Sequence, residues 1–438
     1  MTHARVITVR VIVGIVVLAR AAGTAFGQDV QPSRPPIPTP PWLEVAGEYR
    51  IRVEGVEGAR FQAGNDDAYF LSRLRFGATF LPSESWRAVV QVQDAHVFLK
   101  NQQPSRPPFQ DIVDARLAYV EVGARGDAPI RLRAGRQELS FGEQRLVGTA
   151  DWLNTGRTFD AVRATYKRPH VSVDGFGGWV VRVVADGPNV PEPGTIFYGV
   201  DTVVTGVVPH LTIEPYLFAR RAPNQPTELG GRDVIHSATF GTRVVAAIQP
   251  FDVSVDVAGQ RGGIGSDDIH AWAGHWAVGF TRAHAAWKPR LSGEYNYASG
   301  DDKPRDGRRE TFDQLYPTGH DKYGLADQIG WKNLHHLGGG VELRPTARLS
   351  TAMRYHSWWV ASAADAVYDA SGAVLVPAAA GSPSRHIGQE VDVQSALVAT
   401  PRLRVRAGYA HIVAGGLLRA AVNSRSLSYP YLSLTTSF

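Results

Sequence analysis

Hydrophobic and polar residues alternate along most of this chain with a period of two. Residues 44–54 place Val, Tyr and Ile on one face of an extended segment, and Glu and Arg on the other. Residues 69–81 and 86–93 repeat the pattern on either side of a Pro-Ser turn. This alternation predicts β-strands with one apolar and one polar face. The same rhythm recurs in residues 251–257, 291–297, 349–356, 403–409 and 432–438.

About eighteen such segments follow one another, and no helical period is sustained beyond two turns. Each segment with its connection takes roughly 23 residues, which suits strands of about ten residues with short turns at one end and longer loops at the other. Gly, Pro, Asp and Asn gather in the expected long loops. These loops are residues 100–112, 141–157, 184–197, 221–235, 299–333 and 360–388.

The polar faces distinguish a soluble sandwich from a membrane barrel. They carry Arg with Asp or Glu, together with Ser, Thr, Gln and Gly, which suits a wet interior. Many apolar faces begin or end in Trp, Tyr or Phe, as an aromatic girdle does, and the chain ends on Phe438. In lipid an open sheet edge stays unsatisfied, so the sheet must close. We therefore predict an all-β fold: a single closed antiparallel transmembrane β-barrel of about 18 strands, wide enough for an aqueous channel.

The N-terminus has the pattern of an export signal. Arg5 and Arg10 precede a short apolar run, and small residues follow up to Gln28. We expect residues 1–27 to be a signal peptide and 28–43 a proline-rich periplasmic segment, with the barrel formed by 44–438. No later stretch reaches the ~20 apolar residues of a membrane helix.

Composition narrows the chemistry. The chain has no cysteine, which excludes disulfides and thiolate metal sites. Its net charge of +5 on 438 residues gives no sign of nucleic-acid binding. Most of its 46 basic residues are arginine, whose planar fork suits carboxylate partners.

One stretch carries a family resemblance. RAGRQELSFGEQRLVG (133–148), DWLN (151–154) and RTFDAVR (157–163) resemble the alginate-export family of bacterial outer-membrane barrels, as do RLRFGATF (73–80) and AYVEVG (118–123). The resemblance implies an eighteen-stranded monomeric barrel, inserted into outer-membrane lipid by the barrel assembly machinery. It also implies passage of a polyuronate through an arginine-lined constriction.

The resemblance and the alternation together select the candidate pore-lining residues. Strict alternation puts Arg136 opposite Arg131 and Arg133, unless a bulge near Gly135 re-aims it. Later strands offer Arg354, Arg404 and Arg406 on alternation alone. The candidates are Arg73, Arg75, Arg131, Arg133, Arg136, Arg145, Arg157 and Arg163, with Asp151 and Asp160 as neighbouring acids.

Two interpretations of these arginines stay open: a track for carboxylates, or a salt-bridge network that stiffens the barrel. Trp152 is expected to anchor a folded-in loop rather than stack on sugar. His335-His336, His270 and His275 lack the spacing of a metal site, so we expect no metal, no cofactor and no catalytic residues.

We therefore expect an outer-membrane channel for passive export or diffusion of a polysaccharide or anionic sugar. The alternatives are a general or substrate-specific porin for small organic solutes, and a secreted β-rich glycan-binding or adhesive protein. We expect neither binding of nucleic acid nor an enzymatic activity.

Overall fold

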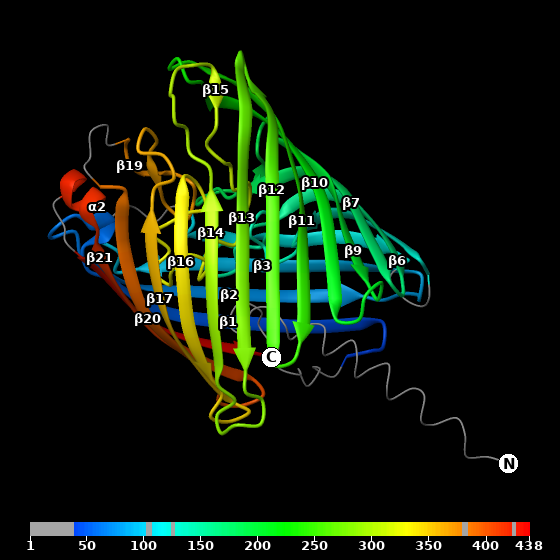
Figure 1. The fold of residues 1–438 in the computed structure, drawn as a ribbon. Helices are drawn as coiled ribbons and strands as arrows, with labels where there is room; N and C mark the ends of the chain where they lie inside the picture. Colours follow the sequence, from blue (N-terminus) through cyan, green and yellow to red (C-terminus); the bar gives the residue numbers. More distant parts are fainter. Residues whose placement is uncertain (1–38, 102–106, 124–127, 379–383, 423–425) are drawn as a thin grey trace.

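The computed structural model describes residues 39–101, 107–123, 128–378, 384–422 and 426–438. The expected signal peptide and most of the proline-rich segment lie outside these residues. The described chain forms a closed antiparallel barrel of 18 strands, each hydrogen-bonded to its sequence neighbours (Figure 1). The last strand pairs with the first from Glu48↔Ser437 to Glu54↔Tyr431, which closes the wall.

The wall strands are β1 (Leu43–Val56), β2 (Asp67–Phe80), β3 (Trp86–Phe98), β4 (Asp111–Val122), β5 (Ile130–Gln137), β6 (Phe159–Arg168), β7 (Val171–Arg182), β9 (Ile196–Thr205), β10 (Leu211–Pro226), β11 (Arg232–Ile248), β12 (Phe251–Ile264), β13 (Asp267–Thr281), β14 (Arg290–Ala298), β16 (Leu334–Leu343), β17 (Leu349–Trp359), β20 (His386–Val398), β21 (Leu403–Ala414) and β22 (Ser426–Ser437). The connections hold η1 (Ala59–Phe61), β8 (Val190–Pro191), β15 (Arg308–Arg309), β18 (Val367–Tyr368), β19 (Val374–Val376) and α2 (Gly416–Ala421). Among the described residues, no helix is long and apolar enough to cross a bilayer.

The predicted closed barrel is confirmed, and its two ends differ as the sequence indicated. Long connections, including residues 138–158, 299–333 and 360–385, gather at one end, while turns such as 169–170 are short at the other. One expected long loop is wrong. β10 and β11 extend so far that only residues 227–231 join them, because Thr227 and Gly231 close a hydrogen-bonded turn.

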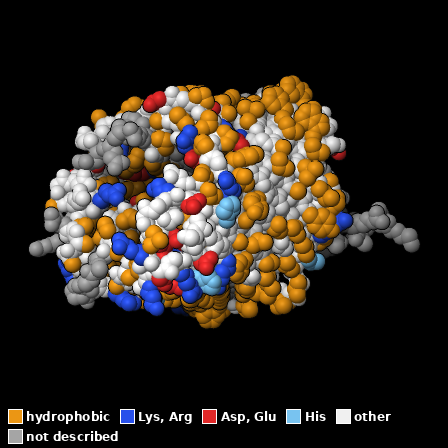
Figure 2. Space-filling view, turned by 90° about the horizontal axis from the view of Figure 1, so that it is seen from above, with side chains coloured by type: hydrophobic (Ala, Val, Ile, Leu, Met, Phe, Trp, Pro, Cys, Tyr) orange, Lys and Arg blue, Asp and Glu red, His pale blue; other side chains and the backbone are white. Residues whose placement is uncertain are grey.

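The outer rows of the strands carry a broad apolar surface. Phe76, Leu132, Val162 and Leu217 are each about half exposed, although a soluble sandwich would bury such rows. Figure 2 shows hydrophobic side chains massed along the outer wall, with Lys, Arg, Asp and Glu gathered around the long-loop end. The secreted adhesive alternative would bury these apolar rows between two sheets, whereas here they face outward around a closed wall.

The lumen is not empty at its long-loop end. Inward-facing aromatics of the wall pack against residues 138–158 and 299–333, which fold into the barrel. Phe159, Phe197 and Phe218 come from β6, β9 and β10, and Phe312 and Trp331 come from the folded-in loop. All five are at most 2% exposed. Sequence periodicity could not separate this packed interior from a wet one, since both occupy inward positions.

Candidate functional site

Two connections, residues 138–158 and 299–333, meet inside the barrel, and we call them the inward loops. Their backbones are joined by hydrogen bonds from Tyr316 N to Leu146 O (2.8 Å) and from Gly148 N to Tyr316 O (2.9 Å). The rings of Trp152 and His320 stack with centroids 3.8 Å apart and planes 1° apart. The two loops therefore form one packed body in the lumen.

Asp151 ties the first inward loop to β1 and β2. Its Oδ1 accepts from Arg75 Nη1 (2.5 Å) and Arg73 Nη1 (3.2 Å), while Arg50 Nη1 donates to its carbonyl oxygen (2.9 Å). Burial opposes ionisation of Asp151, but Arg73 and Arg75 outweigh it and hold the pKa of this carboxyl well below its ordinary value. Arg73 is almost fully buried, whereas the Asp151 side chain is 36% exposed. Here the arginines anchor a loop and the acid faces the lumen.

Arg145 is also an anchor. Its Nη1 lies 3.3 Å from the Tyr323 hydroxyl, and its Nε lies 3.3 Å from Glu143. Glu143 in turn accepts from Arg243 Nη2 on β11 at 2.9 Å. Burial works against the charge of Glu143, yet Arg145, His275 and Arg243 together hold its pKa well below the ordinary value. This pair fastens the loop to the opposite wall.

Arg157 differs from these anchors. Its Nη1 donates to Pro317 O (2.7 Å) and Gly148 O (3.3 Å), so it touches both inward loops. No carboxylate lies within 4 Å of it among the described residues, and no acceptor there binds its Nε and Nη2 groups. Burial lowers the pKa of Arg157 to about 10, so it remains charged at neutral pH. It is a cation with free donors at the inward loops.

The inward rows of β5 and β6 hold Arg131, Arg133 and Arg163. Arg133 Nε donates to Glu121 at 2.7 Å, and Arg163 Nε donates to Asp174 at 2.8 Å. In both pairs the arginine is the more exposed partner, 20% against 3% and 21% against 13%. In each pair the guanidinium group is thus more accessible than the carboxylate.

Arg136 and Asp160 lie on the other side of the wall from Arg131 and Arg133. The register of β5 runs unbroken against both β4 and β6, so no bulge re-aims the chain near Gly135. Arg136 consequently stays on the outward row, where its Nε donates to Asp160 at 2.8 Å. Strict alternation holds here, and this pair is separated from the lumen cluster.

The later candidates also lie on inward rows. Arg354 forms an ion pair with Asp321 of the second inward loop, and Arg404 and Arg406 lie near the short-turn end of β21. Sequence reasoning missed Glu143 and Asp321 because their partners are far away in the chain. Their position in expected long loops was the one available signal for these two residues. It could not identify which arginine each of them contacts.

Several other expectations concerned side chains outside the arginine set. Trp152 packs under Arg52, whose guanidinium carbon lies 3.9 Å from the ring centroid, so it serves as a loop anchor. Trp358 lies inward and donates from Nε1 to Tyr323 O (2.8 Å), so this tryptophan is not part of the outer girdle.

The family model described as alginate export matches residues 41–431. This chain belongs to the alginate-export family. No curated protein matches its sequence. The barrel is a bacterial outer-membrane protein of a channel-forming kind.

Solved structures share the fold of this alginate-export barrel at low identity. The crystal structure of Pseudomonas aeruginosa OpdO has a TM-score of 0.60 and 15% identity, covering 90% of this chain and 97% of the other. OccD3 (OpdP) of that organism has 0.57 and 12%, covering 90% and 91%. Its outer membrane protein OprD has 0.57 and 10%, covering 93% and 96%. These likenesses concern the architecture alone.

Proposed function

We propose that this barrel passes a polysaccharide or an anionic sugar across the outer membrane by passive export or diffusion. The observation that carries the proposal is Arg157, a charged guanidinium with two free donors where the inward loops meet. A guanidinium binds a carboxylate through paired, charge-assisted hydrogen bonds. The carboxylate of a sugar acid at the inward loops would therefore bind the free donors of Arg157.

The inward rows of β5 and β6 carry further guanidinium groups. Arg133 and Arg163 are more exposed than Glu121 and Asp174, so a passing carboxylate meets positive charge first. The acids behind them weaken each contact, which lets a bound anion leave again. A track of this kind needs no energy input.

A substrate-specific porin for small organic solutes is the second candidate. The packed body of the two inward loops favours it, because a filled lumen admits a small solute more readily than a polymer chain. Polymer export requires the inward loops to yield, whereas solute diffusion needs only a narrow passage beside them.

Planar-bilayer recordings test the two candidates. The exporter should prefer anions and be blocked by oligouronates but not by neutral oligosaccharides of equal length. Arg157→Gln should weaken that block about 10-fold or more, since a charge-assisted hydrogen bond contributes about 1.5–3 kcal/mol. Arg136→Gln, on the outward row, is the matched control and should leave the block unchanged.

Other outcomes of the recordings distinguish between the two candidates or contradict both. An anion-preferring pore that passes small solutes and ignores oligouronates would support the porin instead. A cation-selective pore indifferent to oligouronates would contradict both the arginine track and the role of Arg157. We further propose that the barrel acts as a monomer and is inserted by the barrel assembly machinery. Crosslinking in membranes and depletion of that machinery test these two points.

A further inference from the structure

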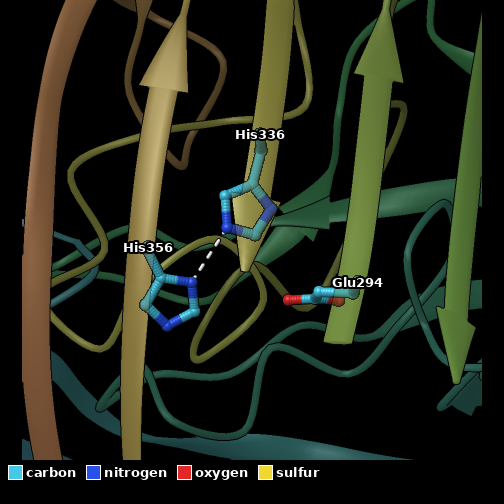
Figure 3. Close-up of side chains that lie close together, drawn as sticks. All are labelled: Glu294, His336 and His356. Atoms are coloured by element: carbon cyan, nitrogen blue, oxygen red, sulfur yellow. Dashed lines mark hydrogen bonds between the residues drawn. The ribbon is translucent and has the colours of Figure 1, made fainter. Parts of the chain in front are cut away.

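Three side chains on neighbouring strands converge inside the barrel (Figure 3). Glu294 lies on β14, His336 on β16 and His356 on β17, and one ligand-type atom of each lies within 4.8 Å of the others. His336 Nε2 and His356 Nδ1 are 2.9 Å apart. We propose that these residues bind a divalent transition-metal ion of the zinc class. This site is independent of the transport function proposed above.

The strand register explains why the three side chains meet. Glu294 is paired across the sheet with Gly338, and Gly338 is paired with His356 on its other side. A Cβ atom at Gly338 would lie 3.0 Å from Glu294 Oε1 and 3.1 Å from His336 Cε1. The missing side chain therefore leaves the space into which the carboxylate and the imidazoles reach.

The donor set selects the class of ion. Two imidazole nitrogens and one carboxylate oxygen suit zinc, iron, nickel or copper, whereas magnesium and calcium favour shells made of oxygen. Three protein ligands leave a position open for water or an anion. Because His336 and His356 are at most 2% exposed, the ligands are already ordered by packing.

A supporting shell surrounds the ligands. His356 Nε2 lies 3.1 Å from Asp392 Oδ2, which is the carboxylate–histidine arrangement common behind metal-bound imidazoles. His336 Nδ1 lies 2.8 Å from the side-chain amide of Asn296, whose oxygen faces His275. Coordination through His336 Nε2 requires the ring proton on Nδ1, with the amide oxygen of Asn296 turned toward it and His275 Nδ1 accepting from the amide nitrogen.

The charges around the site favour a cation. Asp392 Oδ1 and Glu390 Oε2 are buried without a hydrogen-bond donor among the described residues. Arg145 competes for Glu294, at 3.5 Å from Oε2, but Glu143 shares this guanidinium at 3.3 Å. An ion at the three ligands would give the buried acids a nearby positive charge.

The test is metal titration of the full barrel, purified in detergent without a histidine tag. Co²⁺ should give visible d–d bands at one ion per chain, and Zn²⁺ should displace it in calorimetry. His336→Ala and His356→Ala should abolish the bands. Gly338→Ala should weaken binding at least 10-fold by filling the space, although every ligand is retained. Asp392→Asn should weaken it about 10–100-fold through the supporting shell.

His335→Ala is the matched control. His335 is adjacent to His336 but faces outward, where its Nδ1 lies 2.7 Å from the Tyr295 hydroxyl. This variant should bind Co²⁺ normally, and heat-modifiable migration in gels checks that every variant is folded. Absence of saturable Co²⁺ binding to the parent barrel would overturn the site. So would binding that survives in both folded His336→Ala and folded Gly338→Ala.

Discussion

Asp151 shows how a neighbouring carboxylate determines whether an arginine is a structural anchor or a candidate binding group. Beside it, Arg73 and Arg75 are buried and hold a loop. Arg157 has no carboxylate within 4 Å in the described part of the chain, and its Nε and Nη2 groups bind no acceptor there. The same side chain is a structural anchor in one place and a candidate binding group in another. The difference lies in whether a carboxylate satisfies the guanidinium fork.

Replacement of Asp151 should release the first inward loop. Asp151→Asn removes the carboxylate beside Arg75 and leaves Arg73 with Glu48 alone, at 2.8 Å. We expect a loss of about 1–3 kcal/mol after allowance for the exposed carboxyl. We expect larger and noisier single-channel currents. Asp160→Asn, which alters the outward pair with Arg136, is the control. Unchanged currents in Asp151→Asn would show that the loop is held by other contacts.

The pKa of Asp151 sets the pH at which this anchorage fails. Because the pKa in the folded protein is below the ordinary value, the stabilisation is complete above about pH 4 and is lost as the pH falls through the native value. The part of the conductance that differs between the parent barrel and Asp151→Asn should therefore stay constant from neutral pH to about 4 and change only in stronger acid. Asp151→Asn should remove that acid step.

At the scale of elements, the strands were predictable and the inward loops were not. Period-two alternation placed Arg131 and Arg133 on one face and Arg136 on the other without further information. The contact between Arg75 and Asp151 spans 76 positions in the chain, and no local spacing reveals it. The aromatic residues that pack inside the lumen occupy the same positions as lumen-facing polar ones, so only the fold of the loops distinguishes them.

The two inward loops should behave as one unit. Trp152→Ala removes the stack on His320 and the contact with Arg52, together about 1–2 kcal/mol. Amide hydrogen exchange should become about 10-fold faster in both loops, not only in the one that carries Trp152. Trp287→Ala, at an exposed turn of the opposite end, is the control. Faster exchange confined to residues 138–158 would contradict a joint body.

At the scale of the whole molecule, the barrel separates an apolar outside from a charged inside. Leu217 is 50% exposed on the outward row of β10, whereas Ser172 is on the inward row of β7. The apolar outer surface follows from the alternation along the strands and does not depend on any single residue. Its stability therefore depends on which face a change reaches.

Charge on the two faces should have unequal effects. Leu217→Arg should destabilise the barrel by about 2–4 kcal/mol in lipid vesicles, because the guanidinium then faces hydrocarbon. Ser172→Arg should cost much less, since it faces the lumen. Urea titrations followed by tryptophan fluorescence measure both values. Equal losses would contradict the assignment of inner and outer rows.

The seam between β1 and β22 has a consequence for assembly. Gly47 N donates to Phe438 O, and Phe438 N donates back to Gly47 O. These hydrogen bonds join the first and last strands of the chain. Pairing of such high contact order forms slowly. Until it forms, the nascent sheet presents two unsatisfied edges that could recruit strands from other chains. A closed barrel wall therefore requires that a chaperone protect the chain between its synthesis and its insertion into the membrane.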